Sequence, residues 1–269
     1  MSGRIEACFA SLKAANRPGL IPFVTCGDPS PDGAVDLLHA LVAAGADVLE
    51  VGVPFSDPQA DGPVIQRSSE RALARGVGLR RVLEVCRQFR ESDSSTPLVL
   101  MGYMNPVEMF GVEAFAKAAQ AAGVDGLLLV DCPPEEAGPL RSALSSAGLR
   151  SIMLAAPTTD AARLAMIAAA SEGYLYYVSF AGVTGAGSLS VDAVRERVAA
   201  LRTHGGAPVA VGFGVRDASS AAALGVFADA VVVGSALVET LEGAVDSADA
   251  CGRAALFLAP IRAALDAAR

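Results

Sequence analysis

Short apolar segments alternate along this chain with alanine-rich segments, and this alternation constrains the fold more than any other feature. Eight segments have the length and character of buried strands: residues 20–25, 48–52, 98–103, 126–130, 151–154, 175–179, 208–211 and 230–233. The segments between and after them are typical of helices: residues 32–44, 79–91, 112–122, 135–147, 161–170, 191–202, 218–224 and a long C-terminal stretch. Strict alternation predicts a parallel sheet whose strands are joined by helical crossovers.

Eight strand-helix units in a chain of 269 residues are typical of a TIM barrel. An open doubly wound sheet has the same local signals, but the turn at 26–29 lacks the G-x-G-x-x-G of a dinucleotide-binding sheet. We therefore expect an α/β chain with a single (β/α)8 TIM-barrel domain over residues 1–269. The apolar residues Ile5, Phe9 and Leu12 predict an extra N-terminal helix, over residues 4–15, beneath the barrel floor.

Composition argues against several classes of partner. The formal net charge is −8 and the basic residues are scattered, so neither nucleic acid nor an anionic membrane surface is an expected partner. No window reaches the roughly 18 consecutive apolar residues of a spanning helix. The five cysteines are widely spaced and contain no CxxC pair, so we expect no disulfide framework, no zinc ribbon and a cytoplasmic location.

The rare basic residues limit the possible chemistry, because catalytic residues of a TIM barrel lie on the loops that follow the strands. The only lysines are Lys13, before the first predicted strand, and Lys117, within a predicted helix. The only histidines are His39, in a predicted helix, and His204, in the loop before the seventh strand. These positions exclude a Schiff-base lysine, a histidine general base and a histidine metal site. Carboxylates and tyrosines are left to move protons.

Two carboxylates are candidates for acid and base. Glu50 lies within the predicted strand 48–52, where an ionised group is costly without a partner. A buried glutamate with a purely structural hydrogen bond is the alternative. The loop 52–63 that follows is rich in turn-forming residues, yet loops of this length in compact barrels are usually functional. It carries Asp61 to a position from which the loop can fold back towards Glu50, and two carboxylates in different environments permit acid and base roles.

Glycine-rich segments follow the last three predicted strands, at residues 182–185, 212–214 and 234–237. Each alone is more often an ordinary turn. TIM barrels frequently bind phosphate between the loops after strands seven and eight, using the N-terminus of a short extra helix. The three segments together therefore predict a phosphate site and a short phosphate-binding helix after strand eight.

Aromatic residues are sparse, which makes their positions informative. Tyr174 and Tyr176 share one face of the predicted sixth strand, which we expect to be the barrel interior, whereas Tyr177 faces the helices. Packing alone would also explain either interior tyrosine. A slot for a flat apolar ring is expected from residues near strand ends: Phe23, Met101, Leu128 and Phe213.

The run LEVGVPFSDPQADGPVIQ at residues 49–66 resembles the signature of the tryptophan synthase alpha chain family. Further matches follow the family's order over nearly the whole chain, at residues 22–29, 101–106, 182–185, 212–214 and 234–235. The resemblance implies a TIM barrel that cleaves indole-3-glycerol phosphate to indole and glyceraldehyde 3-phosphate. This retro-aldol lyase reaction belongs to L-tryptophan biosynthesis and needs no metal or cofactor in this chain.

The resemblance also implies roles for single residues. Glu50 matches the glutamate that protonates the indole C3 and helps remove the proton of the C3′ hydroxyl, and Asp61 matches the aspartate that accepts the ring N–H proton. Tyr176 matches a tyrosine near that glutamate. The implied substrate-binding positions are Thr184, which contacts the aspartate, Phe23, Met101, Leu128 and Phe213 around the ring, and Gly185, Gly214, Gly234 and Ser235 at the phosphate.

One segment departs from many relatives. Phe180 and Ala181 stand where some have a basic or polar pair, and residues 185–190 are short and lack charged side chains. The closing behaviour of this loop is therefore not predicted by the resemblance, whereas Glu50 and Asp61 are unaffected by it.

The resemblance further implies a partner, the tryptophan synthase beta chain, which uses pyridoxal phosphate to join indole and serine. The expected assembly is an αββα heterotetramer with Asp57 near the partner surface. A stand-alone indole-releasing lyase and a barrel that mainly activates its partner remain alternatives. A sugar-phosphate isomerase would explain the glycines but not the loop at 54–63.

Overall fold

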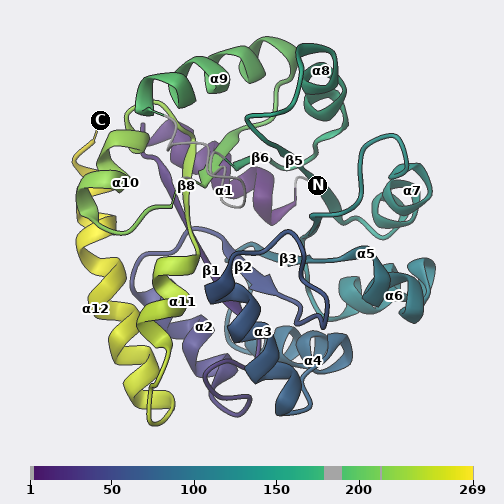
Figure 1. The fold of residues 1–269 in the computed structure, drawn as a ribbon, viewed down its shortest axis with the longest axis vertical. Coiled ribbons are helices and arrows are strands. Elements are labelled where there is room, and N and C mark those ends of the chain that lie inside the picture. Colours follow the sequence, from purple (N-terminus) through teal and green to yellow (C-terminus); the bar gives the residue numbers. More distant parts are fainter. Residues whose placement is uncertain (1–2, 179–189, 213, 269) are drawn as a thin grey trace.

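The structure is a computed structural model that describes residues 3–178, 190–212 and 214–268 (Figure 1). Its strands form one closed parallel barrel in chain order, which confirms the predicted TIM barrel. The strands are β1 (Gly19–Thr25), β2 (Leu49–Gly52), β3 (Leu98–Gly102), β4 (Gly126–Leu129), β5 (Arg150–Ala155), β6 (Leu175–Val178), β7 (Val209–Gly212) and β8 (Ala230–Val233).

The helices surround the barrel (Figure 1). They are α1 (Arg4–Ala14), α2 (Ala34–Ala43), α3 (Pro63–Ala74), α4 (Leu79–Phe89), α5 (Met104–Phe110), α6 (Val112–Ala121), α7 (Gly138–Ser146), α8 (Ala161–Ala170), α9 (Val191–His204), α10 (Ala218–Gly225), α11 (Ser235–Leu241) and α12 (Ser247–Asp266). Among the described residues, none of these helices is long and apolar enough to cross a membrane.

Side chains alternate between the two faces of the strands and form two cores. One core fills the barrel and includes Ile21, Val99, Leu128 and both Tyr174 and Tyr176. The other core packs the outer face of the sheet against the helices and includes Tyr177. The predicted orientations of the three tyrosines are thus confirmed.

Helix α1 covers the floor of the barrel, as expected from its apolar positions. Its residues Ile5, Phe9 and Leu12 are buried and belong to the same core as the barrel interior. The ring of Phe9 packs against that of Tyr174 with 5.7 Å between the ring centroids. The site is therefore expected at the opposite end, where the strands end.

The structure departs from the predicted elements mainly in added helices. Helices α3 and α5 were not predicted, and His204 is the last residue of α9 rather than a loop residue. Most other boundaries differ by a few residues, while α8 and β8 have the predicted bounds. Lys13 in α1 and Lys117 in α6 lie away from the strand ends, as predicted.

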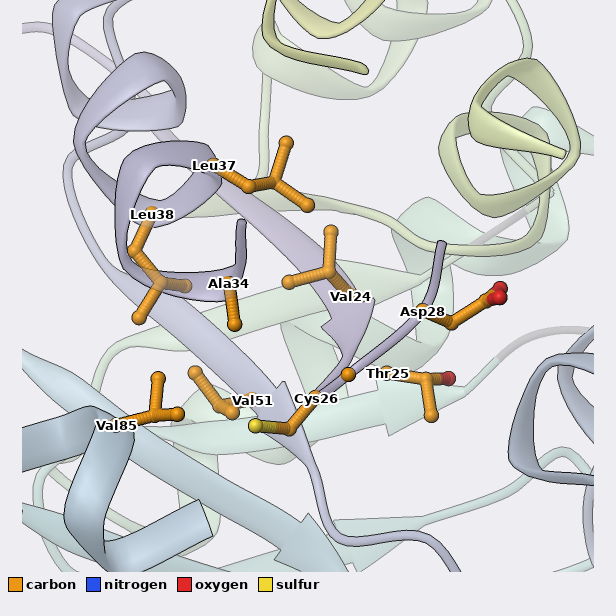
Figure 2. Close-up of a pocket in the computed structure, with 10 residues that line it drawn as sticks. Val24, Thr25, Cys26, Asp28, Ala34, Leu37, Leu38, Val51 and Val85 are labelled. Atoms are coloured by element: carbon orange, nitrogen blue, oxygen red, sulfur yellow. The ribbon is translucent and has the colours of Figure 1, made fainter. Parts of the chain in front are cut away.

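One small pocket lies outside the barrel. It is lined by residues of β1, β2, α2 and α4, including Val24, Val51, Leu38 and Val85 (Figure 2). Apolar side chains dominate its wall, so the catalytic chemistry is better sought in the cavity at the strand ends.

Candidate active site

Glu50 lies at the second position of β2 and is fully buried. In the parallel register its backbone pairs with Phe23 of β1 and with Val99 of β3. The hydroxyl of Tyr174 donates a hydrogen bond of 2.6 Å to Glu50 Oε1. Among the described residues the second oxygen, Oε2, has no hydrogen-bond partner. Tyr174 therefore holds one oxygen of the carboxyl group, and no other described residue holds the second.

Burial raises the pKa of Glu50 to about 7, although the hydrogen bond from Tyr174 lowers it in part. Desolvation disfavours the ionised carboxylate, and the tyrosine hydroxyl favours it. A carboxyl group that titrates near neutrality can give and take a proton at physiological pH. These are the properties required of a general acid that later acts as a base.

Asp61 lies on the loop between β2 and α3 and is held from two sides. The hydroxyl of Tyr103 donates a hydrogen bond of 3.0 Å to Asp61 Oδ2 and accepts one of 3.0 Å from the backbone N–H of Ala60. The side-chain amide of Gln66 donates a hydrogen bond of 2.8 Å to the backbone oxygen of Asp61. Burial raises the pKa of Asp61, and the Tyr103 hydrogen bond partly offsets this rise.

A cavity at the strand ends is lined by Asp61 together with two of the predicted ring-binding residues. Phe23 of β1 and Met101 of β3 line it, as do Asp61 and Tyr103. Leu128 belongs to the barrel-interior core that Met101 packs against. An apolar wall beside one carboxylate suits a flat ring with a single polar N–H.

Tyr176 also lies in the barrel interior, but the hydrogen bond to Glu50 comes from Tyr174. The match of Tyr176 to a tyrosine near Glu50 stays a prediction, and Tyr174 is the tyrosine whose hydroxyl donates to Glu50. The side chain of Tyr176 occupies the space where a Cβ on Gly212 would lie, so this position of β7 requires glycine. Burial, followed by the charges of Glu50 and Asp61, raises the pKa of Tyr176 far above its usual value. Tyr176 is therefore within electrostatic reach of both carboxylates.

Three of the predicted phosphate-binding residues, Gly214, Gly234 and Ser235, belong to the described part of the chain. Gly214 has φ of +57°, a left-handed conformation that favours glycine. Gly234 immediately precedes α11, and Ser235 is the first residue of that helix, as predicted. A Cβ on Gly234 would lie 3.8 Å from Phe23 Cβ, which places these residues beside the apolar cavity. The predicted sites Thr184, Gly185 and Phe213, and the departing residues Phe180 and Ala181, lie outside the described residues.

Asp57 lies on the same loop as Asp61 but is exposed. It accepts a hydrogen bond of 2.6 Å from the hydroxyl of Ser56. Its position on the outer part of the loop is compatible with a role at a partner surface. No cluster of potential metal ligands occurs within residues 3–178, 190–212 and 214–268.

Tyr103 was not predicted as a site residue, and Tyr174 was predicted only to face the barrel interior. Tyr103 directly follows β3, where loops of a TIM barrel carry catalytic groups, so its position was a usable signal. Tyr174 immediately precedes β6 and reaches across the barrel to Glu50, 124 residues earlier in the chain. Tyr174 and Tyr176 both face the barrel interior, and the sequence pattern does not tell which of them reaches Glu50.

The chain is also similar to known proteins of one family. A model of the family described as "Tryptophan synthase alpha chain" matches residues 9–263. The tryptophan synthase alpha chain of Xanthomonas axonopodis pv. citri is 60% identical over 264 residues, covering 98% of each chain. That of Xylella fastidiosa strain M12 is 59% identical over 266 residues, covering 99% of each.

Solved structures agree in both fold and length. The tryptophan synthase subunit alpha of Legionella pneumophila strain Paris superposes with a TM-score of 0.92 at 42% identity, covering 99% of this chain and 100% of that one. A structure of Mycobacterium tuberculosis tryptophan synthase gives 0.89 at 38% identity, with 98% and 99% coverage. The family model over residues 9–263 and relatives about 60% identical over nearly the whole chain show that the chain belongs to the tryptophan synthase alpha chain family.

Proposed function

We propose that Glu50 and Asp61 carry the reaction of this chain, the cleavage of indole-3-glycerol phosphate into indole and glyceraldehyde 3-phosphate. The activity itself follows from membership of the family, whose alpha chains are carbon-carbon lyases. The observation that most supports the two residues is the buried Glu50 carboxyl group, with a pKa of about 7 and one oxygen without a described partner. The whole chain acts as one barrel domain in this proposal.

Cleavage of the carbon-carbon bond requires a place for the bonding electrons. Protonated Glu50 delivers its proton to the indole C3, and Asp61, as a carboxylate, stabilises and accepts the ring N–H proton. The resulting C3-protonated ring is the electron sink. Glu50, now ionised, removes the proton of the C3′ hydroxyl as the bond breaks and the aldehyde forms. The ring recovers its aromatic electrons, and the nitrogen regains its proton from Asp61.

The surrounding residues position the substrate in this proposal. Phe23, Met101, Leu128 and Phe213 contact the ring, and Tyr176 lies within electrostatic reach of both carboxylates. The backbone amides near Gly185, Gly214, Gly234 and Ser235 bind the phosphate, and Thr184 contacts Asp61. Backbone N–H groups suit this role because the chain has no lysine at the strand ends.

Tryptophan synthase alpha chains work in a complex with a beta chain, which holds the pyridoxal phosphate of the second reaction. We propose that Asp57, exposed on the loop that bears Asp61, contacts this partner. We also propose a cytoplasmic location, supported by the odd number and wide spacing of the cysteines.

The direct test of the activity adds indole-3-glycerol phosphate to the purified chain and measures both products. Indole and glyceraldehyde 3-phosphate are expected in equal amounts, without added metal or cofactor. A chain that binds the substrate but releases neither product, with or without a beta chain, would favour the alternative of a mainly activating subunit.

A further inference from the structure

Helix α3 is hydrogen-bonded to the loop that bears Asp61. The helix begins at Pro63, two residues after Asp61. In its first turns, Gln66 donates its side-chain amide hydrogen bond to the backbone oxygen of Asp61 at 2.8 Å and a longer one, 3.4 Å, to that of Pro58. The catalytic loop is thus bound to the helix that follows it. Any displacement of α3 relative to the barrel is therefore expected to displace Asp61 from Tyr103.

One arginine near the other end of α3 fastens the helix to the barrel. Arg71 donates from Nε to Asp28 Oδ1 at 2.9 Å and from Nη2 to Asp28 Oδ2 at 2.7 Å, a parallel two-bond pair. Its third nitrogen, Nη1, donates to Glu242 Oε1 at 3.0 Å. Glu242 directly follows α11, which lies beside α3 (Figure 1). All three guanidinium nitrogens of Arg71 are thus engaged by residues of other barrel units.

The two ion pairs of Arg71, with Asp28 and with Glu242, differ in strength. Asp28, in the loop after β1, is 5% exposed and also accepts hydrogen bonds from Ser68 at 2.7 Å and Arg75 at 3.3 Å. Its carboxylate points away from the apolar pocket of Leu38 and Val85 (Figure 2). Separation of Arg71 from Asp28 would leave a buried charge less well compensated, which is costly. The Glu242 side chain is 40% exposed, so its ion pair contributes little.

We propose that Arg71 is a positioning residue for Asp61. The pair with Asp28 fixes α3 against the end of β1, and Gln66, five residues earlier on the same helix, transmits that position to the backbone of Asp61. The two residues are separated by only about 7.5 Å along the helix axis. Arg71 acts through the helix and not on the substrate. This inference rests on the proposed role of Asp61 as the group that accepts the ring N–H proton.

The test is a double-mutant cycle between Arg71 and Asp61, measured in the complex with the organism's own beta chain. Arg71→Lys keeps the positive charge but cannot form the parallel pair. We expect kcat to fall about ten-fold, while KM stays within two-fold, because the ring and phosphate residues belong to other barrel units. In an Asp61→Asn background the same lysine substitution should change kcat by less than two-fold, since there is no longer a carboxylate to position.

The matched control is Arg67→Lys. Arg67 lies on the same helix, is more exposed than Arg71 and approaches Glu242 only to 3.8 Å. Asp28 is bound by Ser68, Arg71 and Arg75 instead. The kcat of Arg67→Lys should stay within two-fold of wild type. Should Arg71→Lys fail to fold, Asp28→Asn replaces it in the double-mutant cycle with Asp61→Asn. This substitution weakens the same ion pair by changing the partner of Arg71.

Three results would contradict either the positioning role of Arg71 or the proposed function of Asp61. A folded Arg71→Lys variant with wild-type kcat overturns the positioning role. An equal fold-loss in the wild-type and Asp61→Asn backgrounds also overturns it, because a general structural effect acts in both. If Asp61→Asn itself keeps wild-type kcat, the proposed function of Asp61 fails instead, and the two failures are thereby distinguished.

Discussion

At the scale of single residues, the environment of Glu50 links catalysis to stability. The carboxyl group lies in a fully buried strand and meets only one described hydroxyl donor. Burial raises its pKa from the ordinary value of 4.5 to about 7. A surface glutamate would be ionised throughout the physiological range and would be a poor acid there. The same burial that makes Glu50 useful therefore makes its ionised form costly to the fold.

Because ionised Glu50 destabilises the fold, we predict that Glu50→Gln becomes more stable than wild type as pH rises. Because the folded-state pKa is raised, wild type loses stability as pH rises from about 4.5 to about 7, and the glutamine variant does not. The free energy of unfolding of the variant relative to wild type should increase by about 3 kcal/mol between pH 4.5 and pH 8. Denaturant unfolding of both proteins at several pH values measures it. A difference that is constant with pH would show that Glu50 titrates normally.

Tyr174 and Tyr176 should differ in their effect on the titration of Glu50. Tyr174→Phe removes a hydrogen bond to the charged form, so the pKa of Glu50 should rise and the alkaline limb of the kcat profile should move to higher pH. Loss of one such bond is worth about 1 kcal/mol or more, so turnover should fall about ten-fold. Tyr176→Phe should also reduce turnover but leave the limb in place. If Tyr176→Phe moved the alkaline limb and Tyr174→Phe did not, Tyr176 rather than Tyr174 would be the tyrosine that supports Glu50.

At the scale of elements, the strand ends and the short helix after β8 shape the proposed phosphate site. Gly214 has a left-handed backbone, and no described atom lies within 4 Å of an added Cβ. A valine there is therefore expected to act through backbone strain and obstruction of the approach rather than through a clash with a neighbouring side chain. Gly214→Val should raise the apparent Kd for glycerol phosphate at least ten-fold. Calorimetric titration checks this, and unchanged affinity in a folded variant would place the phosphate elsewhere.

The elements also show what the sequence could predict and what it could not. Strands β1 to β8 were predictable because apolar runs buried on both faces have few alternatives, and β8 has its predicted bounds. Helix α3 was missed because its buried face is Ser68, Ser69 and Ala72, and its Gly62 N-cap makes no side-chain hydrogen bond. It therefore lacks both the apolar stripe and the capping signal of a helix. The acid-base pair stays a prediction from position and resemblance, whereas the hydrogen bonds from Tyr174 and Tyr103 to these carboxyl groups depend on contacts between distant segments.

At the scale of the whole molecule, the loop that bears Asp61 also carries the exposed Asp57. We expect the isolated chain to be a slow lyase that the beta chain accelerates by favouring the closed form of the loops bearing Asp61 and Thr184. A differential affinity of about 2.7 kcal/mol would give a hundred-fold gain if the closed form is scarce. Asp57→Ala should weaken this activation more than it lowers the basal rate.

The measurement is the lyase rate of wild type and Asp57→Ala, each with and without saturating beta chain. Equal activation of the two proteins would show that the signal does not pass through Asp57. If neither protein responds although the complex forms, the activation hypothesis is wrong for this chain.

The central claim is that two carboxylates, Glu50 and Asp61, perform the cleavage. Its most direct test is kcat for indole release from indole-3-glycerol phosphate by the purified, folded Glu50→Gln and Asp61→Asn variants beside wild type. We predict a nearly complete loss for Glu50→Gln and a loss of at least about 10²-fold for Asp61→Asn, the scale of general acid-base assistance. A rate within a few-fold of wild type for either variant would contradict the claim.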